Sequence, residues 1–210
     1  TPFVIDLAPR NTLIENVRVL SGQSLASGVF RLGAVRGLVV RNLYINSLWG
    51  GLANIVPVTG AGAAADNGVA DVLFDGVWAN GALNVGTNDA GGNAAILLHG
   101  QAGASLGAVR NVVVRNVHYD SNRANTCFLQ AEGAVGDTDL RAQNRAEITL
   151  DNINFRSASG QRLVCLDADF AVGLQDDATT DLGIHFSRFM PIVRDSWVGG
   201  TRQGFDNNVY

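Results

Sequence analysis

An eight-residue pattern recurs along the chain and limits the possible folds more than any other feature of the sequence. The pattern begins with an apolar residue, any residue and a second apolar residue. A charged residue and then Asn or Gly follow, and the pattern ends with another apolar residue, any residue and an apolar residue. Alternation with period two is typical of half-buried strands, so each copy is predicted to contain two strand halves. Five copies align without gaps, at 12–19, 38–45, 72–79, 112–119 and 148–155, and a degenerate sixth covers 184–189.

The residue between the two halves breaks the alternation, so both halves point inward only if the chain turns there. Asn and Gly tolerate the left-handed backbone of such a corner. We call these residues the corner row: Asn16, Asn42, Gly76, Asn116 and Asn152. Repeated cycles of strand, corner, strand and loop predict an all-β fold, a β-solenoid over residues 1–195. Residues 196–210 are predicted to cap the last coil or to contact a neighbouring chain, since an uncovered end exposes strand edges.

Stacked cycles place equivalent residues about 4.8 Å apart on neighbouring strands. The position before each corner then forms a row of alternating sign, which we call the charged row. Opposite charges at that spacing attract one another, so this row is predicted to be a solvated, stabilising one. Its members are Glu15, Arg41, Asp75, Arg115 and Asp151.

The second position after each corner points outward and forms what we call the ring row. Its members are Arg18, Tyr44, Trp78, His118 and Asn154. Three consecutive ring side chains are expected to make a flat platform. Because aromatic faces stack on sugar rings and also anchor protein interfaces, Tyr44, Trp78 and His118 are predicted to bind a substrate or a partner. An inert surface strip is the third option.

A second candidate site follows from short apolar segments after each repeat, at 29–32, 55–58, 96–99, 127–130 and 164–167. Aligned on their ends, they place His99, Gln130 and Asp167 in one row and Gln101, Glu132 and Asp169 in the next. Carboxylates about 5 Å apart suit a retaining glycosidase, and longer separations, between residues offset along neighbouring strands, suit an inverting one. Glu132 with Asp167 or Asp169 is the predicted catalytic pair, with His99 assisting and Gln101 and Gln130 contacting substrate. A hydrated polar face is the alternative.

Composition excludes several classes of function. The chain is 47% hydrophobic, enough for a core, yet its apolar runs are too short for a membrane span. A net charge of -4 argues against nucleic acid, although all 15 basic residues are Arg. Three scattered His and two Cys predict no metal site, and no cofactor is expected. Cys127 and Cys165 are expected to face opposite sides of their strands, which argues against a disulfide.

The repeated cycle with its Asn corner, seen for example in Val109–Tyr119, resembles the right-handed parallel β-helix proteins over about residues 5 to 190. These include pectate-lyase-like enzymes and phage tail spikes. The five repeats and the degenerate sixth give about six coils. The resemblance implies polysaccharide substrates, a groove on one face or between chains and, in tail spikes, a parallel homotrimer.

With no secretion signal at the start of the chain, we expect a tail-spike or fibre domain, in the virion or outside the cell. Such a domain would recognise a bacterial surface polysaccharide, with or without hydrolysing it. The alternatives are a non-catalytic structural or receptor-binding virion module and a secreted, monomeric polysaccharide-active enzyme.

Overall fold

The computed structural model describes residues 3–5, 10–25, 28–55, 68–81, 94–99, 109–121, 127–132, 147–156, 158, 162–166 and 192–203. These residues form two sheets whose strands are parallel to their neighbours, except for one antiparallel pair at the C-terminal end. The predicted all-β fold is confirmed. Within the described ranges, no helix has the length and apolar character needed to cross a membrane.

The larger sheet contains nine strands. Its main path runs β15-β14-β11-β9-β7-β5-β2, with β3 beside β5 and β13 beside β11. The strands are β2 (Arg10–Glu15), β3 (Arg18–Leu25), β5 (Val35–Gly50), β7 (Val69–Gly81), β9 (Val109–Ser121), β11 (Ile148–Arg156), β13 (Ile192–Arg194), β14 (Ser196–Val198) and β15 (Thr201–Gln203). The five repeats pair in the predicted register, with Leu38 opposite Val72, Val72 opposite Val112 and Val112 opposite Ile148.

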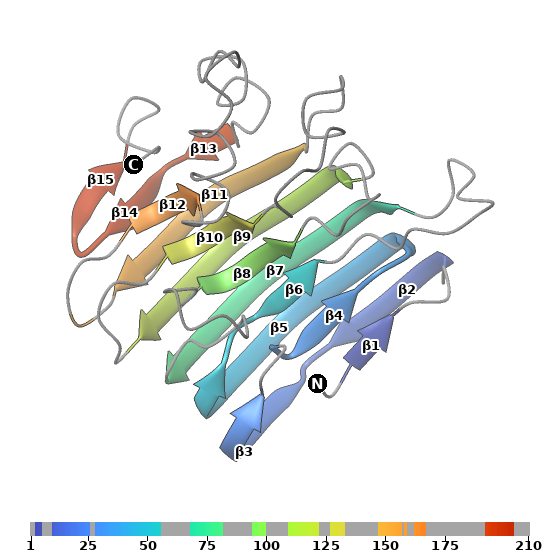
Figure 1. Ribbon diagram of the computed structural model, residues 1–210, viewed down its shortest axis with the longest axis horizontal. Helices are drawn as coiled ribbons and strands as arrows, with labels where there is room; N and C mark the ends of the chain where they lie inside the picture. The colour runs from blue at the N-terminus through green and yellow to red at the C-terminus, as the bar shows by residue number, and fades with distance from the viewer. Residues whose placement is uncertain are drawn as a thin grey trace, which may run out of the picture.

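The smaller sheet contains six strands in the order β1-β4-β6-β8-β10-β12. They are β1 (Phe3–Ile5), β4 (Phe30–Leu32), β6 (Ala53–Ile55), β8 (Ala94–His99), β10 (Cys127–Glu132) and β12 (Arg162–Leu166). In Figure 1 these short strands lie over the long ones, and the colour changes steadily from one end of the stack to the other. Parallel strands stacked in chain order are consistent with a β-solenoid.

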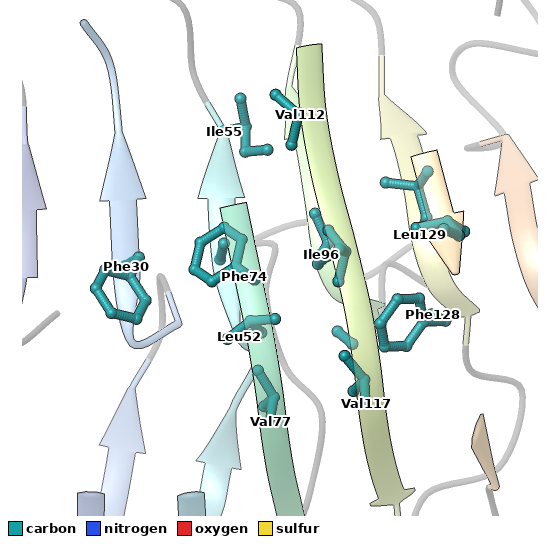
Figure 2. Packing of buried hydrophobic residues seen from close by; sticks show 14 of the residues in the cluster. Phe30, Leu52, Ile55, Phe74, Val77, Ile96, Val112, Val117, Phe128 and Leu129 are labelled. Atoms are coloured by element: carbon teal, nitrogen blue, oxygen red, sulfur yellow. The ribbon is translucent and has the colours of Figure 1, made fainter. Parts of the chain in front are cut away.

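The core lies between the two sheets (Figure 2). Inward residues of the larger sheet, such as Phe74 and Val117, pack with residues of the smaller sheet, such as Phe30 and Phe128, and all four are buried. The rings of Phe30 and Phe74 meet edge to face with centroids 5.5 Å apart. Burial of alternate residues in both halves of each repeat explains why the repeat needs a corner.

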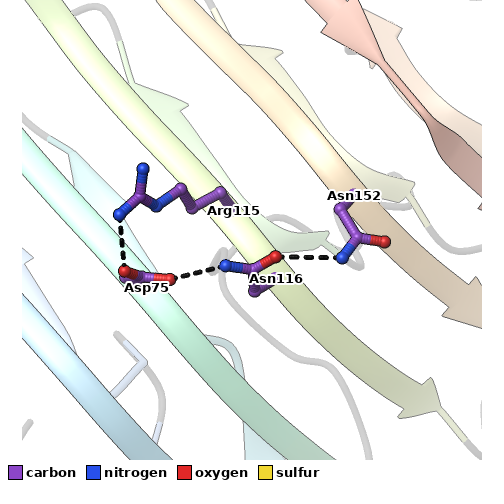
Figure 3. A network of polar contacts seen from close by, with 4 residues as sticks. All are labelled: Asp75, Arg115, Asn116 and Asn152. Carbon is purple, nitrogen blue, oxygen red and sulfur yellow. Dashed lines mark hydrogen bonds and ion pairs between the residues drawn. The ribbon is translucent and has the colours of Figure 1, made fainter.

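The corner row has the predicted backbone conformation. Asn16, Asn42, Asn116 and Asn152 have φ between 53° and 57°, and Gly76 has φ 74°. Their amides also bond along the stack: Asn42 Nδ2 donates to Asn16 Oδ1 at 3.2 Å, and Asn152 Nδ2 donates to Asn116 Oδ1 at 2.9 Å. These bonds link two pairs of neighbouring corners, and Figure 3 shows the one between Asn116 and Asn152.

A second row of left-handed residues lies five positions earlier and was not predicted. It contains Asn11, Gly37, Asp71 and Asn111, with φ between 48° and 69°. Asn111 Nδ2 donates to Asp71 Oδ1 at 2.8 Å, so this row is also hydrogen-bonded between strands. A Cβ at Gly37 would lie 2.8 Å from Asn11 Oδ1, which explains the glycine there.

The predicted sixth repeat, 184–189, lies outside the described residues, and β13 and β14 occupy the sixth position beside β11. Asp195, with φ 39°, forms the corner between them. Ser196 takes an inward apolar position, where its Oγ donates to the Arg194 carbonyl and accepts from the Ile153 amide. The parallel pairing thus extends to Val198, and β15 then folds back antiparallel beside β14.

The register of the smaller sheet differs from the predicted alignment. Leu129 pairs with Ile96 and Val164, whereas the sequence alignment placed Cys127 opposite Ile96. A shift of two residues keeps every side chain on its own face, so alternation alone does not detect it.

The expectation of no disulfide is also wrong, because Cys127 is disulfide-bonded and the chain has two cysteines. Residues 127 to 130 are all buried, so strand alternation does not separate an inner from an outer side there.

Candidate functional site

The ring row is the most regular feature of the outer surface. Its members are Cα partners from strand to strand: Arg18 with Tyr44, Tyr44 with Trp78, Trp78 with His118, and His118 with Asn154. The Tyr44 and Trp78 centroids are 4.7 Å apart and their planes differ by 4°. Trp78 and His118 lie 6.3 Å apart at 17°. The predicted grouping of these three rings is confirmed.

The orientation of the rings differs from the predicted platform. The separation of Tyr44 and Trp78 equals the spacing of neighbouring strands, so the rings stack along the sheet and turn their edges to solvent. Arg18 Cζ lies 5.9 Å from the Tyr44 centroid and covers that end of the stack. Trp78, 38% exposed, therefore presents mainly an edge of its indole to solvent, and the ring faces are turned toward one another.

The ring row extends one strand further than predicted. Trp197 of β14 is the Cα partner of Asn154. It lies between buried Ser196 and Val198 and is itself half-buried, so it shares the outward face. Trp197 fits the eight-residue pattern if Asp195 is counted as the corner residue. Asp is suitable there because it also adopts the left-handed conformation.

A row of polar side chains, which we call the polar row, runs beside the ring row. It lies two residues further along each strand, on the same outward face. Its Cα partners are Asn46, Asn80, Asp120 and Arg156. Amide, carboxylate and guanidinium groups thus border the ring edges. These residues did not appear in the sequence prediction, although the same alignment contains them.

The polar row and the ring row are joined at His118. Its Nε2 lies 2.9 Å from Asp120 Oδ2, two residues along β9. Both side chains are about one-third exposed (34% and 41%), so this contact remains accessible to a ligand. The Asp120 carboxylate orients the imidazole, whose Nδ1 is the second hydrogen-bonding atom of the ring.

The charged row is confirmed in register and gains Arg194 opposite Asp151. Among the described residues, only Arg115 and Asp75 form a direct ion pair in it, with Nη2 donating to Oδ2 at 2.8 Å. This bond lowers the pKa of the Asp75 carboxyl below its usual value, against an opposing effect of burial. Asn116 Nδ2 donates to the other Asp75 oxygen at 2.8 Å, which links the charged and corner rows (Figure 3).

The predicted catalytic residues are only partly placed. His99 and Glu132 are Cα partners on β8 and β10, so they lie on neighbouring strands of the smaller sheet. The sequence alignment had placed Gln130 opposite His99, but Gln130 pairs with Leu97. Gln130 is 3% exposed, so it is not at the surface, and its Oε1 has no hydrogen-bond partner in the described part of the chain. The remaining predicted site residues, Gln101, Asp167 and Asp169, lie outside the described residues.

The two candidate sites therefore belong to different sheets: the ring row to the larger one, and His99 with Glu132 to the smaller one. In the part of the chain that the structure describes, no group of three or more His, Cys, Asp or Glu side chains is arranged to hold a metal ion. Comparison of the chain with protein-family models, with curated proteins and with solved structures finds no match in any of the three.

Proposed function

We propose that this chain is a right-handed parallel β-helix domain of about six coils that recognises a bacterial surface polysaccharide. The observation that carries this proposal is the double strip of ring and polar rows, which repeats on successive strands of one sheet. A linear polymer also repeats its groups at regular intervals, so a strip with a spacing of about 4.8 Å can bind it at several positions at once.

The proposed contacts are hydrogen bonds and edge contacts. The Tyr44 hydroxyl, the Trp78 indole N–H and the His118 imidazole donate to or accept from sugar hydroxyls. Asn46 and Asn80 supply amide groups beside them. Such exposed, periodic hydrogen-bonding groups suit a hydrated polysaccharide better than an apolar partner surface.

The proposed setting is a phage tail spike or fibre, in the virion or outside the cell, assembled as a homotrimer. The disulfide at Cys127 supports an oxidising environment, where such bonds persist. Light scattering on the purified protein is expected to give the mass of three chains. A monomer would contradict the tail-spike form and favour a secreted enzyme.

Binding is tested with a panel of immobilised capsular polysaccharides and lipopolysaccharides. Trp78→Ala is expected to weaken retention of the bound polysaccharide about tenfold, since it removes the central member of the row. Leu13→Ala is the matched control, because Leu13 is 55% exposed on the same sheet but lies outside both rows. Equal retention of wild type and Trp78→Ala would contradict this use of the ring row.

Hydrolysis of the bound polymer is a second candidate activity, supported by the pairing of Glu132 with His99 on adjacent strands. A carboxyl group and an imidazole are groups that can supply the proton transfers of glycoside cleavage. Glu132→Gln is expected to abolish release of oligosaccharides while binding persists. The control is Glu147→Gln, which changes an exposed carboxylate directly before β11 of the larger sheet. Release of oligosaccharides by Glu132→Gln at the wild-type rate would favour the non-catalytic virion module.

A further inference from the structure

The ring row is continuous at one end and interrupted at the other. From Arg18 to His118, each ring has a neighbouring ring or guanidinium on the side toward the N-terminal end of the stack. The next member, Asn154, has no ring, and Trp197 follows it. The face of His118 that is turned toward Asn154, and the side of Trp197 turned toward it, therefore have no stacking partner within the row.

The short side chain of Asn154 lies between two ring-bearing residues in the register of the sheet, and we call the space above it the notch. Its two neighbouring strands, β9 and β14, are about 10 Å apart, twice the usual strand spacing. The amide ends two bonds beyond Cβ, whereas the His118 and Trp197 rings reach further from the sheet. Asn154 is itself partly buried, so its short side chain forms the base between the two flanking residues.

The width of the notch favours a puckered ring over a flat one. Carbon atoms in contact lie about 3.5–4 Å apart, so a flat ring between two aromatic faces needs about 7–8 Å between them. The strand separation of about 10 Å leaves room for the thicker chair of a pyranose. Sugar C–H groups on both faces of the chair would then contact the two aromatic side chains.

Arg156 supplies an exposed guanidinium group at the border of the notch. Arg156 lies two residues after Asn154 on β11, so both point outward on the same strand. Its Cα partner Asp120 is bonded to His118 Nε2, and Arg156 forms no ion pair within the described residues. A guanidinium group recognises carboxylates through two parallel hydrogen bonds.

We propose that the notch at Asn154 binds one acidic sugar residue, with its pyranose ring between His118 and Trp197 and its carboxylate on Arg156. This inference rests on the proposed function and narrows it, since it makes the recognised polysaccharide one that contains carboxylated sugars. The remaining ring row would then align the polymer on either side of this residue.

Glucuronate and glucose form a matched pair of probes, because they share the ring and differ in the carboxylate. The indole N–H signals of the protein, followed by ¹⁵N-resolved NMR, report binding in the millimolar range that single sugars show. Glucuronate is expected to shift the Trp197 signal, with glucose at the same concentration shifting it several-fold less. Absence of any Trp197 shift with both sugars would overturn the proposal.

Two substitutions separate the parts of the notch. Asn154→Phe fills the gap in the row and is expected to abolish the response to both sugars, while the thermal unfolding midpoint confirms that the variant folds. Arg156→Gln is expected to keep the weak response to glucose and to remove the preference for glucuronate. An unchanged glucuronate response in Asn154→Phe would place binding elsewhere.

Asn154→Ala is the control substitution, since it keeps the two walls and shortens the residue between them. The glucuronate response is expected to persist. If polysaccharide binding depends on Trp78 but glucuronate leaves the Trp197 signal unaffected, the proposed sugar site at the notch is wrong and the proposed function stands. If glucuronate binds at Trp197 but no polysaccharide of the panel is retained, the proposed function fails instead.

Discussion

The two sheets of this protein are held in register by different features. In the larger sheet, left-handed residues recur at the same two positions of successive strands, and their side chains bond from strand to strand. In the smaller sheet, the described strands β4, β6, β8, β10 and β12 contain no residue with positive φ. That sheet relies on apolar packing and on the disulfide at Cys127.

This difference shows why one sheet tolerates less variation than the other. A shifted strand in the larger sheet would move a left-handed corner out of line and would break its side-chain bonds. A two-residue shift in the smaller sheet keeps apolar residues facing the core. The larger sheet, which carries the ring and polar rows, is therefore the more precise support for a binding surface.

The largest effect is expected from removing the covalent link of the smaller sheet. Cys127→Ser should lower the free energy of unfolding by about 2–4 kcal/mol, because the unfolded chain loses a constraint over a long loop. Chemical denaturation measures this loss. Thiol titration of the denatured wild-type protein should detect no thiol before reduction and two afterwards; two thiols without reductant would contradict the bond.

A smaller effect is expected from a corner of the larger sheet. Gly76→Val should cost about 2 kcal/mol, because a β-branched residue is strained at φ 74°. Its Cβ would also lie 3.2 Å from Asn42 Oδ1. The control is Gly76→Asn, which inserts the residue found at the neighbouring corners and should cost less than about 1 kcal/mol. Equal denaturation midpoints for the two variants would show that the corner conformation does not limit stability.

The smallest effect is expected from the charged row, and it depends on pH. The pKa of Asp75 is lowered in the folded protein, so its carboxylate stabilises the fold above the unfolded value near 3.8, and this stability is lost as the pH falls through the lowered value. Asp75→Asn should therefore cost at most about 1 kcal/mol at pH 7, given the partly exposed pair.

The deficit of this variant should shrink as the pH is lowered from 7 to 3, because the wild-type carboxyl group takes up a proton as the pH falls toward its lowered pKa. Denaturation curves at both pH values measure the difference. Asp151→Asn is the control in the same row, since Asp151 forms no direct ion pair in the described part of the chain. A deficit for Asp75→Asn that is equal at pH 7 and at pH 3 would show that the pair with Arg115 does not contribute.

Much of the larger sheet was predictable, because a corner needs a residue that tolerates a left-handed backbone, and few residue types do. Asn42, Gly76 and Asn116 therefore marked both the strand positions and their register. The sixth repeat was missed because Asp195 and Ser196 replace the usual Asn and apolar residue. Ser196 can occupy this inward position because its hydroxyl forms hydrogen bonds with β11 and β13, and a local sequence pattern does not reveal such bonds.

The sequence by itself determined the stacking of parallel strands, the corners and which side chains share each row, since these follow from alternation and from backbone sterics. Only the tertiary structure decided how the rings of Tyr44, Trp78 and His118 are oriented, because strand spacing turns them face to face and directs their edges outward. It also decided that Trp197 completes the row beyond Asn154. That placement depends on hydrogen-bond register between segments far apart in the chain, and it leaves the notch that we propose as a sugar site.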